Sequence, residues 1–232
     1  MASEQETRIN MLLFKGLTQL DLTGPFEILV RMSGAKIELV GEDTAAVSCG
    51  RSLSITPTTT RDKADRADLL VVPGGSGVDD AILDPGWVNF VRDQAQSARW
   101  VFGICTGSLL LGAAGLLRGR RATGHWQARD LLGHFGATVS DERMVVDGNI
   151  FTAGGVTAGI DMALRVVAEL RGDEAAKRIQ LQIEYDPQPP FRSGSPFVAS
   201  AETIKAQREA GAERRRVREA AVARAAAALA AN

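Results

Sequence analysis

The sequence predicts an α/β protein with a mostly parallel sheet that helices cover on both faces. Short apolar runs, typical of strands buried on both sides, alternate along the chain with stretches of helical character. The length of 232 residues fits one domain of this class and allows a sizeable core. The elements follow in chain order.

The first half of the chain predicts three strands, an edge ribbon and a helix. Residues 9–14 (INMLLF) form an apolar run, and a helix begins near Thr23-Gly24-Pro25 after the following loop. KIELV at 36–40 predicts the second strand. SLSITPTTT at 52–60 is β-rich but contains a proline, which favours an edge ribbon. DLLVVPGG at 68–75 predicts a third strand that ends in a glycine turn.

The second half contains a fourth strand, a hairpin and most of the helices. RWVFGIC at 99–105 is the strand, and MVVDGNIFTAGG at 144–155 predicts the hairpin, since DGN lies between two apolar pairs. The predicted helices are residues 85–98, 106–117, 125–136, 156–170 and 173–183.

The C-terminal part has a different composition. Residues 184–199 hold four of the eight prolines and are expected to be extended, whereas residues 200–231 are rich in alanine and arginine and predict helix. The run Arg214–Arg218 lies among glutamates, so a solvated helix face is expected there. The prediction is a single domain over 1–199 and a helical extension over 200–232 that packs on or beside it.

Composition excludes several classes of protein. The net charge is −1, without the basic surface of a nucleic-acid binder, and no apolar run reaches the ~18 residues of a membrane span. The polar N-terminus does not resemble a signal peptide, so a cytoplasmic protein is expected. Two cysteines fit a reducing compartment, and two histidines leave little with which to build a zinc site.

Cys105 is the candidate nucleophile. The segment Gly103-Ile104-Cys105-Thr106-Gly107 has the form G-x-C-x-G between a predicted strand and a predicted helix. This is the thiol counterpart of the G-x-S-x-G elbow, whose tight turn exposes the central side chain. The positive end of the helix dipole would favour the nucleophilic thiolate. A buried structural cysteine is the alternative, and the elbow position favours the nucleophile.

Three other segments follow predicted strands and converge with Cys105 at one edge of the sheet. Asp21 is either a surface loop residue or an acid/base partner of the thiol, if burial raises its pKa. Gly74-Gly75 form either a plain turn or, with the Thr106 amide, an oxyanion-type donor pair. Gly154-Gly155 form either a helix-start loop or a wall of the same pocket.

The other cysteine and the histidines are weaker candidates. Cys49 lies in the predicted ribbon without an elbow and is expected to be structural. His125 has a path to the site, but a capped or core-edge histidine is favoured. Cysteine hydrolases usually pair the thiol with a histidine, and no histidine follows His134. The sequence therefore favours a thiol that works with a carboxylate.

Five segments resemble the ThiJ/PfpI superfamily, which is class I glutamine amidotransferase-like, and within it the isocyanide hydratases. The resemblance implies a flavodoxin-like, doubly wound fold over nearly the whole chain. The same subgroup includes N-terminal domains of AraC-like transcription factors. The segments are LDLTGPFEIL (20–29), VVPGGSGV (71–78), ICTGSLLLGAAGLLRGRRATGHW (104–126), AGGVTAGIDMAL (153–164) and QLQIEYDPQPPF (180–191).

The resemblance implies a role for each matching residue. Cys105 matches the nucleophile, Asp21 the catalytic carboxylate and Thr106 a threonine needed for catalysis. Val156 matches a position whose backbone carbonyl hydrogen-bonds the cysteine. Gly154 matches a glycine whose freedom affects a helix motion after the thiol is modified.

The sequence departs from the family pattern at two positions. Ala153 stands in place of one glycine of a GGG run, and Gly124 replaces the second threonine of an ATTHW run. Neither change touches the expected chemistry, although each alters the surroundings of the pocket. Thr106 stands where several related peptidase-like enzymes carry histidine.

The implied reaction is the hydration of an isocyanide to an N-substituted formamide through a cysteine-linked thioimidate. It needs no metal and no organic cofactor, and the resemblance also implies a homodimer with sites near the subunit interface. Three alternatives stay open. A glyoxalase- or deglycase-like enzyme would place glutamate and histidine beside the cysteine. A regulatory ligand-binding module would need a DNA-binding domain of ~100 residues. A redox sensor would oxidise at Cys105 without turnover.

Overall fold

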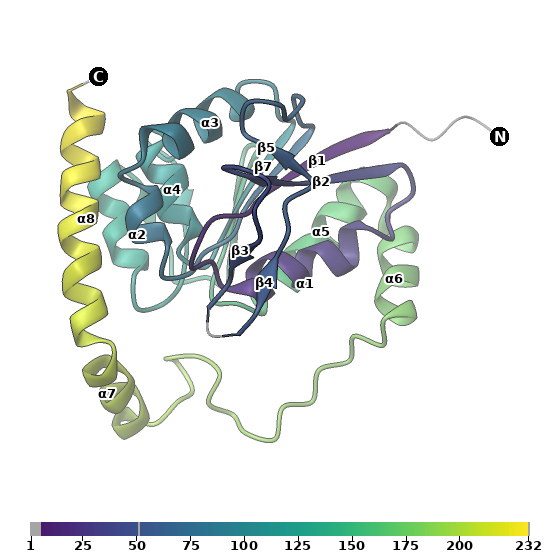
Figure 1. The fold of residues 1–232 in the computed structure, drawn as a ribbon. Helices are drawn as coiled ribbons and strands as arrows, with labels where there is room; N and C mark the ends of the chain where they lie inside the picture. Colours follow the sequence, from purple (N-terminus) through teal and green to yellow (C-terminus); the bar gives the residue numbers. More distant parts are fainter. Residues whose placement is uncertain (1–5, 51, 232) are drawn as a thin grey trace.

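A central sheet organises the structure, a computed structural model that describes residues 6–50 and 52–231. Within these residues the sheet has seven strands and lies between two layers of helices (Figure 1). This confirms the predicted doubly wound α/β fold. The strands lie in the order β10 (Met144–Asp147), β11 (Ile150–Ala153), β7 (Trp100–Ile104), β6 (Leu69–Val72), β1 (Thr7–Leu12), β2 (Ala35–Gly41) and β5 (Thr59–Thr60).

The direction of the strands decides where a site can form. In the described part of the chain, β10 and β11 pair antiparallel as the predicted hairpin, and the other neighbours in this sheet pair parallel. β1, β6, β7 and β11 therefore end at one common edge. The turns after these strands meet at that edge, which is where ligands bind in open α/β sheets.

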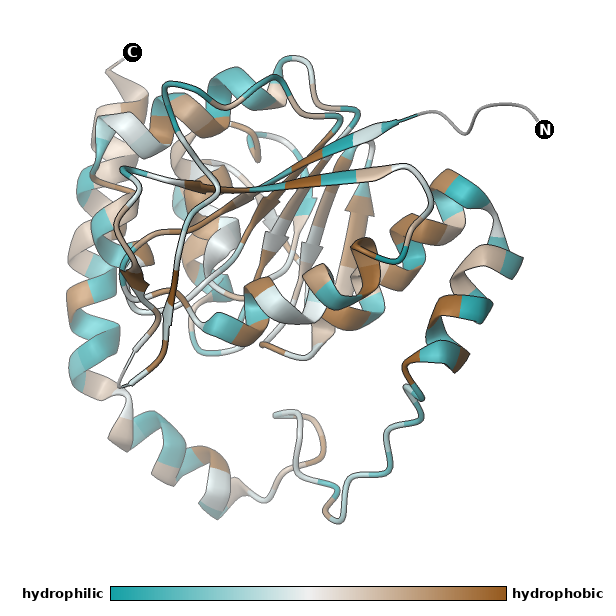
Figure 2. Ribbon diagram, turned by 45° about the vertical axis from the view of Figure 1, so that its right-hand side comes forward, coloured by the Kyte–Doolittle hydropathy of each residue, from teal (hydrophilic) through white to brown (hydrophobic). Residues whose placement is uncertain are grey.

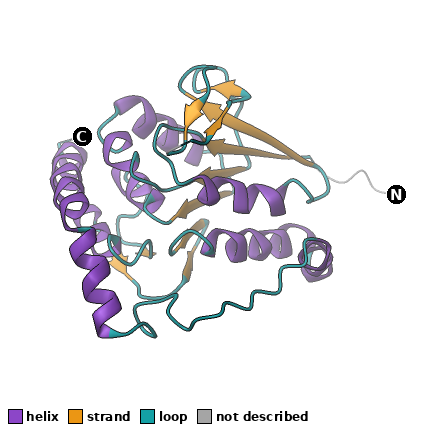
Figure 3. Cartoon of the chain, turned by 60° about the horizontal axis from the view of Figure 1, so that its bottom comes forward, coloured by secondary structure: helices purple, strands orange, loops and turns teal. Residues whose placement is uncertain are grey.

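Two short ribbons lie outside the main sheet (Figure 3). One pairs β3 (Val47–Ser48) with β4 (Ser54–Ile55), and the other pairs β8 (Arg121–Ala122) with β9 (Thr138–Val139). The predicted edge ribbon at 52–60 is thus divided between β4 and the sheet-edge strand β5. Pro57 lies between them, at a position where no ladder hydrogen bond is required of it.

The helices form one layer on each face of the sheet (Figure 1). One layer contains α1 (Gln19–Leu29) and α5 (Ala158–Arg171), with α6 (Asp173–Gln182) packed on α5. The other contains α2 (Val78–Ala81), α3 (Pro85–Ala95), α4 (Gly107–Ala113) and the 3₁₀ helix η1 (Arg129–Phe135). The sequence predicts no helix at α2, and the helix expected over 125–136 is the shorter η1.

Helix α1 begins earlier than the sequence predicts. The expected start near Thr23–Pro25 is wrong, because the helix begins at Gln19 and Pro25 lies inside it. Proline is most frequent in the first turn of a helix, which favoured the later start. Pro25 has no N–H to donate to the carbonyl of Asp21, four residues earlier. Asp21 therefore lies in the first turn of α1 rather than in a loop.

Apolar residues gather on the strands and on the helix faces turned toward them (Figure 2). The central strands are almost fully buried, including Ile9, Met11 and Phe102, as parallel strands between two helical layers must be. Among the described residues, no helix combines the length and hydropathy that crossing a membrane requires.

The C-terminal segment crosses the molecule before it turns into helix. Residues 184–200 run without a helix or strand from α6 to α7 (Ala201–Ala210), whose N-cap Ser200 accepts a hydrogen bond from the N–H of Thr203 at 3.1 Å (Figure 3). Helix α8 (Ala212–Ala230) then packs against α2, α4 and η1. The division into a domain over 1–199 and an extension over 200–232 stays a prediction.

Candidate active site

Cys105 lies in a sharp turn between β7 and α4. Its φ is +57°, and among the described residues Glu184 is the other non-glycine residue with a positive φ. The N–H of Cys105 points to the carbonyls of Ala153 and Gly154, each at 3.0 Å. Its carbonyl accepts a hydrogen bond from the N–H of His125 at 3.1 Å. The turn has the backbone geometry of a nucleophile elbow, held from two sides.

The glycines of the elbow are required by close approach. A Cβ atom at Gly107 would lie 2.2 Å from the carbonyl oxygen of Val72, and one at Gly103 would lie 2.8 Å from a methyl carbon of Leu111. Any larger residue would push the elbow away from β6 or from α4. The G-x-C-x-G pattern therefore reflects packing as well as turn geometry.

Asp21 reaches the elbow from the first turn of α1. Its side chain is fully buried, with 0% exposure, and Oδ2 accepts a hydrogen bond from the N–H of Gly74 at 2.9 Å. The thiol of Cys105 faces the same carboxylate, and its proximity lowers the pKa of Asp21. Among the described residues, Oδ1 has no hydrogen-bond partner. Burial outweighs the Gly74 and Cys105 groups and raises the pKa of Asp21 to about 6, so the group can lose or gain a proton near neutrality.

The thiol of Cys105 is protonated in this resting arrangement. Burial raises its pKa to about 12, and the negative charge of Asp21 adds to the effect. The backbone groups of Thr106 and Val156 lower it, but by less. Desolvation and the charge of Asp21 therefore oppose the thiolate that the helix dipole would favour. The neutral thiol faces the carboxylate of Asp21.

The loop after β11 supplies the other side of the elbow. The backbone of Val156 faces the Cys105 sulfur and lowers the pKa of the thiol, as a backbone N–H does. The contact of the Val156 carbonyl that the resemblance implies stays a prediction. Gly154 accepts from the Cys105 N–H, as described above, and donates its own N–H to the carbonyl of Arg143 at 2.8 Å.

The turn after β6 holds Thr106 and Asp21 in place. The N–H of Gly75 donates to the hydroxyl of Thr106 at 2.9 Å, and that hydroxyl donates to the carbonyl of Gly75 at 3.1 Å. The N–H of Gly74 already donates a hydrogen bond to Asp21. Neither glycine amide is left for a substrate, so the expected oxyanion-type pair is wrong for Gly74-Gly75. Their role is close approach, since a Cβ at Gly74 would lie 2.6 Å from the Thr106 nitrogen.

His125 lies at the margin of the site. Its Nδ1 accepts a hydrogen bond from the N–H of Gln127 at 3.3 Å, and its ring lies against Gly155, where an added Cβ would be 3.1 Å from Cδ2. Burial lowers the pKa of His125, and the charge of Arg218 lowers it further. The imidazole is therefore neutral near pH 7, in the core-edge position that the sequence favoured.

The space around Cys105 is narrow. The gap bordered by Cys105, Thr106 and His125 is too tight for a water molecule. A cavity of about 350 Å³ lies next to it, between the backbone of Gly154–Thr157 and the segment Gly194–Phe197. A third cavity of about 620 Å³ lies between η1 and helices α7 and α8, and Cys105 is not part of its lining. The second cavity is the space nearest the elbow that a small molecule can enter.

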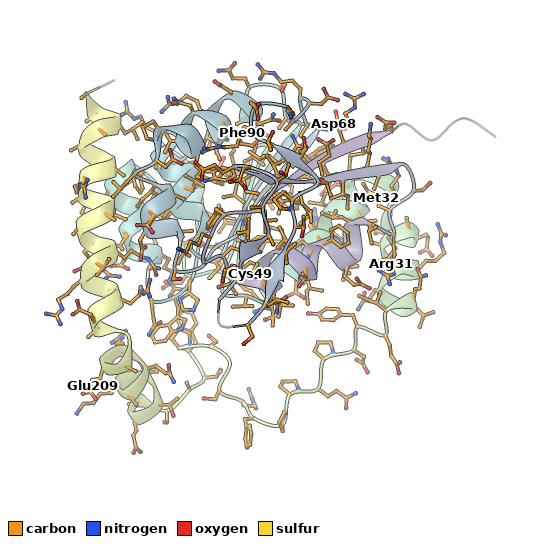
Figure 4. All side chains as sticks on the ribbon, in the orientation of Figure 1. Arg31, Met32, Cys49, Asp68, Phe90 and Glu209 are labelled. Carbon is orange, nitrogen blue, oxygen red and sulfur yellow. The ribbon has the colours of Figure 1, made fainter. Side chains whose placement is uncertain are left out.

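Cys49 lies elsewhere, on the ribbon β3–β4 (Figure 4). Both cysteines are free and buried. The sulfur of Cys49 lies 3.5 Å from the carbonyl of Val47, which it faces as a weak donor. In residues 6–50 and 52–231, no cluster of three or more histidine, cysteine, aspartate or glutamate side chains is arranged to hold a metal ion.

Sequence analysis missed two charged residues beside the site. Asp79 and Arg218 form a buried ion pair, with Nε 2.6 Å from Oδ1, directly behind the Gly75 turn. The expected solvated face over 214–218 is therefore wrong for Arg218, which is 8% exposed. The helical repeat of the sequence could have predicted this burial, because Arg218 lies on the same face of the helix as three small apolar residues. These are Ala221, Val222 and Ala225.

Comparisons with known proteins place the chain in a family. The sequence model described as the DJ-1/PfpI family matches residues 7–169. The chain is 46% identical over 222 residues to an isonitrile hydratase of Pseudomonas putida, covering 96% of this chain and 97% of that protein. A crystal structure of a THiJ/PfpI family protein from Pseudomonas syringae superposes with a TM-score of 0.92 at 40% identity, over 95% of this chain and 92% of that one.

A second type of relative is a regulator. The chain is 29% identical over 186 residues to the HTH-type transcriptional regulator GbdR of Pseudomonas aeruginosa. The match covers 77% of this chain but 50% of that protein. The similarity therefore concerns half of the regulator's length.

Proposed function

Because the chain belongs to the DJ-1/PfpI family, we propose that it is an isocyanide hydratase, a cofactor-independent lyase that converts R–NC and water into R–NH–CHO. One observation carries the proposal. A buried carboxylate, Asp21, is held by the Gly74 N–H beside a cysteine at a positive-φ elbow and has a pKa of about 6. The similarity to an isonitrile hydratase over nearly the full length of both chains supports the choice of substrate.

The first step forms a carbon–sulfur bond. The Cys105 sulfur attacks the terminal carbon of the isocyanide while Asp21 removes the thiol proton. Asp21 then delivers that proton to the same carbon, which carries the developing negative charge. The product is a thioimidate, R–N=CH–S–Cys105, and Asp21 is again ionised. A carboxyl with a pKa near 6 is suited to both transfers, because it gains and loses a proton at small cost.

The second step consumes water. Ionised Asp21 removes a proton from a water molecule that attacks the thioimidate carbon and passes this proton to the imine nitrogen. Collapse of the resulting tetrahedral carbon breaks the carbon–sulfur bond and releases R–NH–CHO. The proton of the hydroxyl group goes to the leaving sulfur, which restores the starting thiol and ionised Asp21. The covalent route divides one difficult addition into two easier ones.

Thr106 and the Val156 N–H complete the proposed site. The Thr106 hydroxyl is engaged on both sides by Gly75, so we assign it to positioning rather than to proton transfer. The Val156 N–H faces the sulfur and stabilises negative charge on it as the carbon–sulfur bond breaks. Gly154 and Gly155 line the 350 Å³ cavity, which we assign to the R group.

The test is incubation of the purified protein with an aryl isocyanide and mass-spectrometric detection of the formamide. Intact-protein mass spectrometry during turnover reports the covalent adduct on Cys105. Formamide production together with the adduct is the expected result. No formamide at any pH between 5 and 9 would show that the substrate class is wrong, and oxidation of Cys105 in air without turnover would favour a redox sensor.

The proposal includes a cytoplasmic homodimer. Two free cysteines fit a reducing compartment. Large apolar side chains are exposed on and beside the extended segment, with Leu181 at 82%, Phe191 at 77% and Phe197 at 65%. A second copy of the chain that covers them would remove this surface from water. Light scattering after size exclusion measures the mass of the assembly, and a monomer at micromolar concentration would contradict the proposal.

A further inference from the structure

Helix α8 lies outside the segment that the family model matches, yet it packs against α2 and α4, the helices that follow the Gly75 turn and the Cys105 elbow (Figure 1). One face of the helix is buried: Val222 is fully covered, and Ala221 and Ala225 are nearly so. These small residues allow a close approach to α2, α4 and η1. Arg218 is one turn N-terminal to them on the same face, so its charged group is carried into the interior.

The guanidinium of Arg218 makes two kinds of contact there. Its Nε lies 2.6 Å from Oδ1 of Asp79, and its Nη2 lies 3.3 Å from Oδ2. The same Nη2 donates to the carbonyl of Gly75 at 3.4 Å. Asp79 is 5% exposed, so both partners of the ion pair are removed from water.

The Gly75 carbonyl connects this ion pair to the site. It also accepts the hydroxyl proton of Thr106, at 3.1 Å, while the Gly75 N–H donates to the same hydroxyl. Thr106 directly follows Cys105, and its backbone contact lowers the pKa of the thiol. Arg218 is therefore one hydrogen bond from the Gly75–Thr106 pair and two from the cysteine elbow.

We propose that Arg218 is a positioning residue of the active site, which fixes the Gly75 carbonyl and through it the orientation of Thr106 and Cys105. Docking of α8 does not explain the arrangement. Burying an ion pair stabilises a fold little better than apolar packing does, and the alanine face already provides such packing. Arg215 also anchors α8, with Nη1 2.7 Å from Asp130, at a place remote from Gly75.

An arginine is needed for this role. The planar guanidinium presents several donors in a fixed fork, so one side chain pairs with Asp79 and reaches Gly75 at the same time. A lysine at position 218 would retain the charge opposite Asp79 but has a single ammonium to place. Arg218→Lys therefore keeps the ion pair and loses the bridge to the Gly75 carbonyl.

The experiment compares Arg218→Lys with Arg215→Lys, both in a Cys49→Ala background so that alkylation reports Cys105. Three quantities are measured: kcat and KM for an aryl isocyanide, the rate of Cys105 alkylation by iodoacetamide at one pH, and the thermal midpoint. For Arg218→Lys we expect kcat to fall about 10-fold or more with KM within about twofold, and alkylation to slow, as expected of a displaced reacting group. Arg215→Lys is expected to change only the thermal midpoint.

The outcomes separate positioning from docking. Unchanged kcat and alkylation in folded Arg218→Lys would overturn the proposal, and so would equal losses in both variants. If Arg218→Lys fails to fold, Asp79→Asn/Arg218→Gln buries a neutral pair instead, and the same loss of alkylation rate is expected. The kinetic measurement rests on the proposed function, but the alkylation measurement does not. If the wild type does not turn over isocyanides, the alkylation rates still decide whether Arg218 positions the cysteine elbow.

Discussion

The two cysteines of this chain share three properties and differ in two. Both are free, both are buried, and burial raises the pKa of both thiols. Of the two, Cys105 alone lies at a turn with positive φ, and the pKa of its thiol alone is shifted by a neighbouring carboxylate. Cys49 faces a backbone carbonyl on a two-stranded ribbon.

This difference shows that burial and a raised pKa do not identify a nucleophile. Each describes a thiol that resists ionisation, which by itself favours an inert cysteine. At Cys105 the same burial acts on Asp21 and raises the pKa of that carboxyl to about 6. Desolvation thus makes Asp21 a proton acceptor beside the Cys105 thiol, whereas the Cys49 thiol faces a backbone carbonyl. The comparison is testable by substitution, from the largest expected effect to the smallest.

Cys105→Ala is expected to abolish isocyanide turnover and adduct formation while the fold is kept. The covalent route has no sulfur in this variant, and Cys49 is on a separate ribbon. Formamide production and circular dichroism are the measurements. Turnover that persists in Cys105→Ala and disappears in Cys49→Ala would reverse the assignment of the two cysteines.

Asp21→Asn is expected to lower kcat by about 10²–10⁴-fold, the range for a positioned proton-transfer group. In the wild type, kcat/KM should rise with pH through about 6, since the carboxyl acts as a base only when ionised. The variant should lack this rise and should not recover at the high pH that ionises Cys105. Near wild-type rates at any pH would reduce Asp21 to a residue that orients the thiol.

Thr106→Val is expected to lower kcat by about 10²-fold, because a displaced elbow misplaces the reacting sulfur. The variant keeps the shape but leaves the N–H of Gly75 without its partner and the Gly75 carbonyl with the Arg218 contact alone, at a cost of about 1–3 kcal/mol in stability. Thr106→Ser keeps the hydroxyl and serves as the control. Equal kinetics for the valine and serine variants would remove the hydroxyl from the proposed site.

Cys49→Ala is expected to have the smallest effect. The sulfur makes one weak hydrogen bond and touches no residue of the elbow, so kcat and KM should stay at their wild-type values. A modest loss of thermal stability is expected from the lost packing of a buried side chain. A large fall in kcat without unfolding would show that the ribbon contributes to the site.

Elements with one dominant signal were predictable from the sequence. The apolar runs at β1, β6 and β7, the DGN hairpin and the G-x-C-x-G turn each follow from local chemistry. The convergence of Asp21, Gly74 and Cys105 then follows from the parallel strands, which end at one edge. The start of α1 was missed because Pro25 is an unusual interior residue whose cost is absorbed by tertiary packing.

The long-range partners were not predictable in the same way. The state of the Cys105 thiol depends on how completely the folded chain removes water, which a local motif does not encode. The N–H groups of Gly74 and Gly75 are occupied by Asp21, from α1, and by Thr106, which precedes α4, and these side chains meet only in the folded chain. The Asp79–Arg218 pair joins residues 139 positions apart, and a charged run concealed the buried face of its helix.

The positive φ of Cys105 also affects how stable the molecule can be. A side chain with a Cβ in the left-handed region costs roughly 1–2 kcal/mol, a strain that glycine does not experience. Asp21 acts in the same direction: its pKa of about 6 lies above the ordinary value of 3.8, so native stability falls as pH rises between them. Two locally unfavourable residues thus lie at the point where the chemistry is proposed, so activity is expected there at the expense of stability. We therefore expect Cys105→Gly and Asp21→Asn, although impaired in turnover, to unfold at higher temperature than the wild type at pH 7.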